Sequence, residues 1–206
     1  MKKGFTLVEL LVVIAILALL MSIVIVTLNP AEILRKTRDT KRVSDLSSLY
    51  TALNLYTTDK SSPDLDHVGA CATGIFYSLD STACPTVSVS QAPRISPICA
   101  SPSPRLVDGH GWVPVEFSSI SSGSPLSALP VDPTNTLTTP FLYYTYGCDS
   151  GTVTFELDAN MESVYYKAGG DGDVVGKDGG NAGTVYEVGS EPGLDLFGTP
   201  STNFYL

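Results

Sequence analysis

The chain has 206 residues and a formal net charge of −9, and 43% of its residues are hydrophobic against 16% charged. Residues 1–42 hold seven Lys and Arg against three Asp and Glu, a net +4, whereas residues 43–206 hold five against eighteen, a net −13. A body of that sign repels phosphate groups, which excludes a general nucleic-acid-binding domain. Disorder throughout is excluded as well, because residues 5–58 and 141–166 are rich in aliphatic and aromatic side chains.

Residues 5–28 form an apolar run with a single charge, Glu9. As a helix, this run would be about 36 Å long, enough to cross a hydrocarbon core of about 30 Å. Its Leu, Ile, Val and Phe side chains together favour insertion by about 5 to 10 kcal/mol, whereas Glu9 costs at most about 3.5 kcal/mol. The run therefore predicts a membrane-spanning helix despite its carboxylate.

Three interpretations compete for this N-terminal run. A cleaved secretory signal would have a shorter apolar stretch and a small-residue cleavage site, whereas this run ends in Leu28, Asn29 and Pro30. A plain membrane anchor explains the hydrophobicity but gives no use for Glu9. The third interpretation depends on the leader itself, a basic MKKG followed directly by FTLVE in residues 1–9.

This order of basic residues, glycine, Phe-Thr-Leu-Val-Glu and a long apolar run resembles the processing site of type IV pilins and of the related pseudopilins of type II secretion. The resemblance is close over residues 1–58 and loose beyond them. It implies that a prepilin peptidase cuts after Gly4 and methylates Phe5, and that Glu9 supports filament assembly. It also implies a single-pass protein of the cytoplasmic membrane before assembly, and an extracytoplasmic or cell-surface filament afterwards.

Cleavage after Gly4 would create a positive amino group at Phe5, about 6 Å of helix rise from Glu9. A carboxylate is tolerated in lipid when a cation meets it. If neighbouring subunits are staggered by about one helical turn, Glu9 of one chain can face the Phe5 amine of the next. We hypothesise that this pairing neutralises both charges and sets the register of subunit addition.

The flank that follows the apolar run is more basic than the leader. A count of positive charges would place this flank in the cytoplasm, whereas the resemblance places it outside. We follow the resemblance, because all four cysteines lie downstream and disulfides need an oxidising compartment. The flank predicts either a solvated or headgroup-contacting face, or a contact with the acidic body of a neighbouring subunit. Its basic residues are Arg35, Lys36, Arg38, Lys41 and Arg42.

Pro30 is expected to bend the helix or to restart it, since proline removes one backbone hydrogen bond. Beyond it, apolar residues recur at helical spacing, which predicts a helix over residues 31–58 with its apolar face on a sheet. The amphipathic half of the long helix thus covers residues 29–58. The apolar positions are Val43, Leu46, Leu49, Tyr50, Leu53 and Tyr56.

Residues 59–111 form a long connection rich in Pro, Ser, Gly, Asp and Cys. Cys71, Cys84 and Cys99 lie within it and Cys148 lies beyond it, at spacings that match no usual zinc site. Four cysteines in an exported region predict two disulfides, with three possible connectivities. We favour Cys71–Cys84, which closes a short loop, together with Cys99–Cys148, which ties the connection to the sheet.

Residues 112–206 are expected to hold an antiparallel sheet and a C-terminal tail. The fold class is therefore α+β: a long N-terminal helix, membrane-spanning in its first half, packed on a C-terminal antiparallel sheet in a pilin-like arrangement. LPVDP at residues 129–133, ahead of a tyrosine-rich strand, also resembles the pilin body, although an ordinary proline turn has the same pattern. The expected strands are residues 74–79, 112–117, 141–147, 151–158, 164–167 and 184–188.

One loop carries candidate metal ligands. Asp171, Asp173 and Asp178 in residues 168–183 could supply oxygens to Ca²⁺. The loop lacks the acceptor at position 5 and the closing glutamate of an EF-hand, and its aspartates do not align with the calcium loop of some pseudopilins. We expect a flexible surface loop and no cofactor, with calcium as the alternative.

The sequence predicts a structural protein and not an enzyme, because His67 and His110 are accompanied by no recognisable nucleophile or second catalytic group. We expect a subunit of a type IV pilus-like filament, with a pseudopilin of a secretion or DNA-uptake system as the alternative. A membrane-anchored extracytoplasmic binding domain or enzyme is the alternative of another class. The expected partners are copies of the chain, a prepilin peptidase, the assembly machinery and, before assembly, the membrane.

Overall fold

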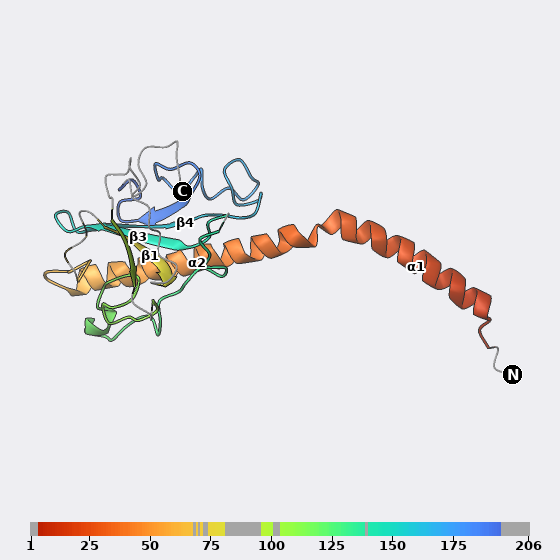
Figure 1. Ribbon diagram of the computed structural model, residues 1–206, viewed down its shortest axis with the longest axis horizontal. Coiled ribbons are helices and arrows are strands. Elements are labelled where there is room, and N and C mark those ends of the chain that lie inside the picture. Colours follow the sequence, from red (N-terminus) through yellow and green to blue (C-terminus); the bar gives the residue numbers. More distant parts are fainter. Residues whose placement is uncertain are drawn as a thin grey trace.

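The computed structural model describes residues 4–67, 69, 71, 74–80, 96–100, 104–138 and 140–194. Within these residues, two consecutive helices form a rod, and a sheet and loops form a body around the far half of the second helix (Figure 1). The first turn of α1 lies at the end of the rod that points away from the body (Figure 1). This is the α+β, pilin-like arrangement that the sequence predicts.

The first helix, α1, spans Leu7–Leu28. It is long and apolar enough to cross a membrane, and none of the window Leu7–Ile25 is buried against the rest of the described chain. Its large apolar side chains are exposed at consecutive positions and therefore on every side of the helix. A helix that is apolar all round is stable only when lipid or protein covers it.

The second helix, α2, spans Pro30–Asp59 and is separated from α1 by Asn29 alone. Asn29 has a φ of 40° in the left-handed region, which asparagine tolerates better than most residues. Pro30 is the first residue of α2, where a missing N–H is no loss. The amide of Glu32 donates to the carbonyl of Asn29 at 3.0 Å, so a new helix starts here. The rod bends at this junction (Figure 1), as expected from Pro30.

The apolar positions predicted along α2 are confirmed. Leu46, Leu49, Leu53 and Tyr56 are buried in the main core, and Val43 and Tyr50 are packed against it. Aromatic rings dominate the opposite side of the contact, including Trp112, Phe117, Tyr144, Tyr146 and Phe155. Burial of such large apolar surfaces is the main source of cohesion in the body.

The described strands form one sheet in the order β2-β1-β3-β4-β5. The pairs β1–β3, β3–β4 and β4–β5 are antiparallel, but β1 and β2 are parallel, which corrects the expected antiparallel sheet. A parallel pair needs a longer connection than a hairpin, and the sequence between the end of β1 at Asp80 and the start of β2 at Ser96 is long enough for one. The strands are β1 Gly74–Asp80, β2 Ser96–Ala100, β3 Tyr144–Asp149, β4 Thr154–Ala159 and β5 Tyr186–Gly189.

Two expected strands are wrong, and β2 was not expected. Within residues 112–117, Trp112, Val113, Val115 and Phe117 are buried in the core. The amides bond locally, however: Val115 donates to the Val113 carbonyl and Phe117 to the Val115 carbonyl. The apolar pattern thus identified core residues, while the backbone turns into the short 3₁₀ helix η1 Phe117–Ser119. Residues 164–167 form turns, and Val164 is 70% exposed.

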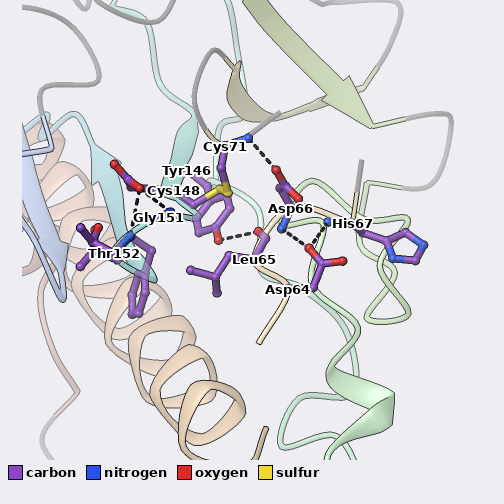
Figure 2. The surroundings of a disulfide bond; sticks show 12 residues. Asp64, Leu65, Asp66, His67, Cys71, Tyr146, Cys148, Gly151 and Thr152 are labelled. Atoms are coloured by element: carbon purple, nitrogen blue, oxygen red, sulfur yellow. Dashed lines mark hydrogen bonds between the residues drawn. A yellow bond between two sulfur atoms is a disulfide. The ribbon is translucent and has the colours of Figure 1, made fainter. Parts of the chain in front are cut away.

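The favoured disulfide connectivity is also wrong. Cys71 is bonded to Cys148 on β3, so the loop after α2 is tied to the central part of the sheet (Figure 2). The Cys71 amide donates to Asp66 at 2.7 Å, and the hydroxyl of Tyr146 donates to the Leu65 carbonyl at 2.8 Å. The pairing of Cys71 with Cys148 depends on the packing of the loop after α2 against β3, which the spacing of the cysteines in the sequence does not reveal. Cys99 is disulfide-bonded as well, and Cys84 lies outside the described residues.

The junction yields a first prediction. Replacing both Asn29 and Pro30 by alanine should join α1 and α2 into one straighter helix, because alanine favours helix and restores the missing donor. The distance between spin labels introduced at Ser22 and Ser47 of the full-length chain in detergent should increase.

The Asn29→Gly variant is the matched control, since glycine adopts the left-handed conformation without a steric cost. Its label distance should equal that of the wild type. If the double alanine variant also keeps the wild-type distance, the bend does not come from these two residues.

Candidate processing and assembly site

The peptide bond between Gly4 and Phe5 lies ahead of the first helix. Residues 4–6 have no regular secondary structure, and the Phe5 side chain is 86% exposed. No described atom lies within 4 Å of the position that a Cβ would take at Gly4. This bond is therefore open to a peptidase, and its exposure fits the cleavage position predicted from the sequence. Lys2 and Lys3 lie outside the described residues.

The start of α1 is fixed by a reciprocal pair of hydrogen bonds between Thr6 and Glu9. The Thr6 amide and hydroxyl donate to Glu9 Oε2 at 2.8 and 2.7 Å, and the Glu9 amide donates to Thr6 Oγ1 at 3.3 Å. This is a capping box, which satisfies two donors that the helix itself leaves unpaired. This box was not predicted from the sequence, although a Thr followed three residues later by Glu is its recognised signal.

The capping box points the Glu9 carboxylate toward the start of the chain. Cleavage after Gly4 would place a new amino group at Phe5, one residue before the cap. The carboxylate can then serve both its own helix and a cation, since each carboxylate oxygen accepts more than one hydrogen bond. The pairing of Glu9 with the Phe5 amine of another subunit stays a prediction.

The middle of α2 is held to the body by a buried charge cluster around Arg42. The Arg42 side chain is fully buried and donates to Asp39 at 2.7 Å and, through Nη2, to Asp132 at 3.0 Å and Glu162 at 2.7 Å. Asp39 and Asp132 are fully buried too. Asp132 belongs to the LPVDP segment, so this segment acts as a docking loop for α2.

The cluster is well satisfied by hydrogen bonds. Burial alone would lower the pKa of Arg42 and raise the pKa of Glu162. The hydrogen bonds among these groups outweigh burial. The pKa of Arg42 is therefore raised, and the pKa of Glu162 is lowered. The stability that depends on ionised Glu162 is present above its unfolded pKa of about 4.3. It is lost as the pH falls through the lower folded value.

Among the five basic residues of the flank, buried Arg42 contradicts the expectation of an exposed basic face, whereas the side chains of Arg35 and Lys41 are 50% and 58% exposed. The contact of this flank with headgroups or with an acidic neighbour stays a prediction. Each of the five residues has a partner in its own chain: Arg35 is 3.6 Å from Glu32, Lys41 is 3.1 Å from Asp45, and Lys36 lies 3.2 Å above the ring of Tyr165. Arg38 binds Glu162, and Arg42 is buried as described. The helical charge pattern alone could not show that loops from the body reach these residues.

A groove separates the α1–α2 junction from the loop that follows β4. The helices contribute Leu28, Asn29, Glu32, Ile33 and Lys36, and the loop contributes Val164, Tyr165, Gly169, Gly170 and Asp171. The Val164 amide donates to Glu32 Oε1 at 2.6 Å, which fastens the loop to the first turn of α2. The groove therefore lies where the rod leaves the body.

The loop aspartates proposed as calcium ligands do not converge. Asp173 accepts the amides of Gly169 and Gly176, and these hydrogen bonds lower its pKa. Asp178 accepts the amide of Glu187 at 2.9 Å, while Asp171 lines the groove. Among the described residues, these three aspartates do not form a common cluster of possible metal ligands.

The two histidines lie together on the surface of the body. Their ring centroids are 5.7 Å apart, and His110 Nδ1 is 3.4 Å from an Asp108 oxygen. The His110 and Asp108 side chains are 70% and 53% exposed. A solvent-exposed pair of this kind gives no enclosed site for catalysis, and the expectation that both are loop residues is confirmed.

The N-terminal geometry agrees with what the comparison with known proteins finds. The family model of the prokaryotic N-terminal methylation motif matches residues 1–25, and this motif is the leader signature of type IV prepilins and pseudopilins. The match covers the leader and most of α1 but not the body. No curated protein and no solved structure matches the chain.

The Arg42 cluster yields a second prediction. The Arg42→Ala variant should lose about 3–5 kcal/mol of unfolding free energy, because Asp39 and Asp132 would be left buried without their cation. Denaturant unfolding of the full chain in detergent, followed by near-UV circular dichroism, measures the change.

The neighbouring Lys41→Ala variant is the matched control. Its side chain is 58% exposed, and its loss should cost less than about 0.5 kcal/mol. Equal effects of the two substitutions would contradict the structural role of the cluster.

Proposed function

We propose that the chain is a structural subunit of a type IV pilus-like filament, released from the membrane for assembly after cleavage behind Gly4 and methylation of Phe5. One observation carries the proposal: a helix that is apolar on every side directly follows a matched prepilin-type leader. A soluble binding protein has no use for such a helix. A plain anchor has no use for the leader.

Two environments can cover α1. Lipid chains cover it before assembly, and α1 helices of other subunits cover it in a filament. Helices that leave lipid gain little from the hydrophobic effect, so their cohesion comes from close packing repeated along the filament. The acidic body would remain in water, because residues 43–206 carry a net −13.

Glu9 supplies the selective element of this proposal. A charged carboxylate in an apolar core is costly unless a cation meets it. Processing would provide that cation at Phe5, so an uncut subunit would bring an acid without its partner. The proposal thereby explains why cleavage would precede assembly.

An anchored extracytoplasmic enzyme or binding domain is the rival from another class. It would keep its N-terminus uncut and act as a single chain. The same α1 would then serve only to hold the body at the membrane, and Glu9 would be dispensable. The two proposals therefore differ in measurable outcomes at the N-terminus.

Processing is the third prediction. The exported protein should begin at Phe5 and carry one methyl group on its α-amine, as determined by intact mass and N-terminal sequencing. The Gly4→Leu variant should keep the leader, because a side chain would be added at a position that now carries none. A native wild-type protein that retains residues 1–4 would contradict the proposed function.

Assembly is the fourth prediction. The Glu9→Leu variant should insert into the membrane at least as well as the wild type, yet form no filaments, as seen by fractionation and electron microscopy. The Glu9→Gln variant separates charge from capping, because glutamine can complete a capping box without a charge. Failure of both variants supports charge pairing, and normal filaments from Glu9→Gln would refute it.

A further inference from the structure

Three acidic side chains are buried together on the face of the sheet that is turned away from α2. On β4, Phe155 and Leu157 belong to the core beneath the sheet, so the alternate residues Glu156 and Asp158 point to the other face. Asp158 lies directly opposite Glu187 of β5. The three carboxyl groups are almost fully buried, with 1, 0 and 3% of Glu156, Asp158 and Glu187 exposed.

This placement is electrostatically costly. Like charges directly across an antiparallel pair destabilise a sheet, and burial increases the repulsion. Burial, followed by the charges of Glu156 and Glu187, raises the pKa of Asp158 well above its ordinary value. The cluster therefore favours any positive species that can share its oxygens.

The oxygen atoms are arranged to converge. One carboxylate oxygen from each of the three residues lies within 4.8 Å of the others. Oxygens bind Ca²⁺ at about 2.3–2.6 Å, so ligands on opposite sides of the ion are about 4.6–5.2 Å apart. The observed spacing thus suits a common cation with little movement.

One oxygen of the cluster is left without a hydrogen-bond donor in the described part of the chain. Asp158 Oδ1 is buried and has no hydrogen-bond partner among the described residues, whereas its other oxygen accepts the Thr145 hydroxyl at 3.1 Å. A buried polar atom without a partner costs about 1–3 kcal/mol, and more if it is charged. A bound ion would remove this cost.

The loop around the cluster packs closely against it. The amides of Ala182 and Leu194 donate to Glu187 and Glu156 at 2.7 and 2.6 Å, which orients these carboxylates. A Cβ at Gly180 would lie 2.0 Å from Glu187 Oε2, so only glycine lets the backbone come this near. The carboxylates are therefore held by fixed neighbours, as metal ligands usually are.

We propose that Glu156, Asp158 and Glu187 bind a Ca²⁺ ion that joins β4 to β5. Three carboxylates and no nitrogen or sulfur ligand form a site for a hard cation. Ca²⁺ fits better than Mg²⁺, which keeps several waters and usually binds one or two carboxylates. The site differs from the loop aspartates considered from the sequence, and the proposal does not depend on filament assembly.

The fifth prediction tests this site on the full-length chain in detergent, stripped with a chelator and titrated with Ca²⁺ alone. Calorimetry should show one saturable site. Ca²⁺ at about 100 times Kd should raise the unfolding midpoint by about 5–10 °C. The Asp158→Asn variant should bind at least 10-fold more weakly, yet unfold at a higher temperature than the calcium-free wild type because it lacks the buried charge.

The Asp171→Asn variant is the matched control, because Asp171 is an exposed aspartate outside the cluster. It should bind Ca²⁺ as the wild type does. Glu187→Gln provides a second ligand variant and should also bind more weakly. A wild type that binds no Ca²⁺ and is stabilised only by acid would show protons shared among the carboxyls and overturn the proposal. Wild-type affinity in both Asp158→Asn and Glu187→Gln would also overturn it.

Discussion

The dominant constraint on this molecule is that α1 must be covered by something outside its own body. Its side chains are apolar around the whole circumference, and none of the span Leu7–Ile25 is buried against the described chain. Lipid and other apolar helices are the two environments that satisfy such a surface. The rod also has an accessible bond at Gly4, a capped helix start and one carboxylate near that start; under the proposed function, these features serve the transfer of the helix from lipid to a filament.

The body is subject to a different constraint, because it has to hold the long helix α2 in one position. Apolar packing fixes the second half of α2 to the sheet, but such packing is non-directional. The Arg42 cluster adds direction, since its guanidinium meets Asp39 on its own helix and Asp132 and Glu162 from the body. A buried charge cluster adds little net stability when it is compared with apolar residues of similar volume, but losing one partner is costly. It therefore favours one position of α2 over others with similar apolar contacts.

Sequence patterns predicted the features that depend on local periodicity. The apolar run and the spacing of Leu46, Leu49 and Leu53 were sufficient for both helices, and alternation was sufficient for β3 and β4. The parallel pairing of β1 with β2 was not predictable, because it depends on the direction in which the chain returns to the sheet after β1, and no local pattern encodes that direction. Residues 112–117 show a related limit, since hydrophobicity indicates burial but not the direction of the backbone hydrogen bonds.

The candidate sites show the same difference between local sequence patterns, which are predictable, and long-range contacts, which are not. Gly4, Phe5 and Glu9 were identified because their signal lies within nine consecutive residues. The partners of Arg42 come from distant loops, and a basic residue on a helix usually faces solvent, so its burial had no local sign. The burial of Glu156 and Asp158 on β4 also had no local signal, because alternation on a strand predicts one polar, solvated face. Only the fold shows that the segment with Ala182 and Leu194 covers this face. Because this polar face is buried, the acidic side chains of an ordinary alternating strand form a buried cluster, which a cation would stabilise. The two proposals share one principle: a carboxylate in an apolar or buried setting needs a cation, which at Glu9 would be made by proteolysis and at the sheet would be taken from solution.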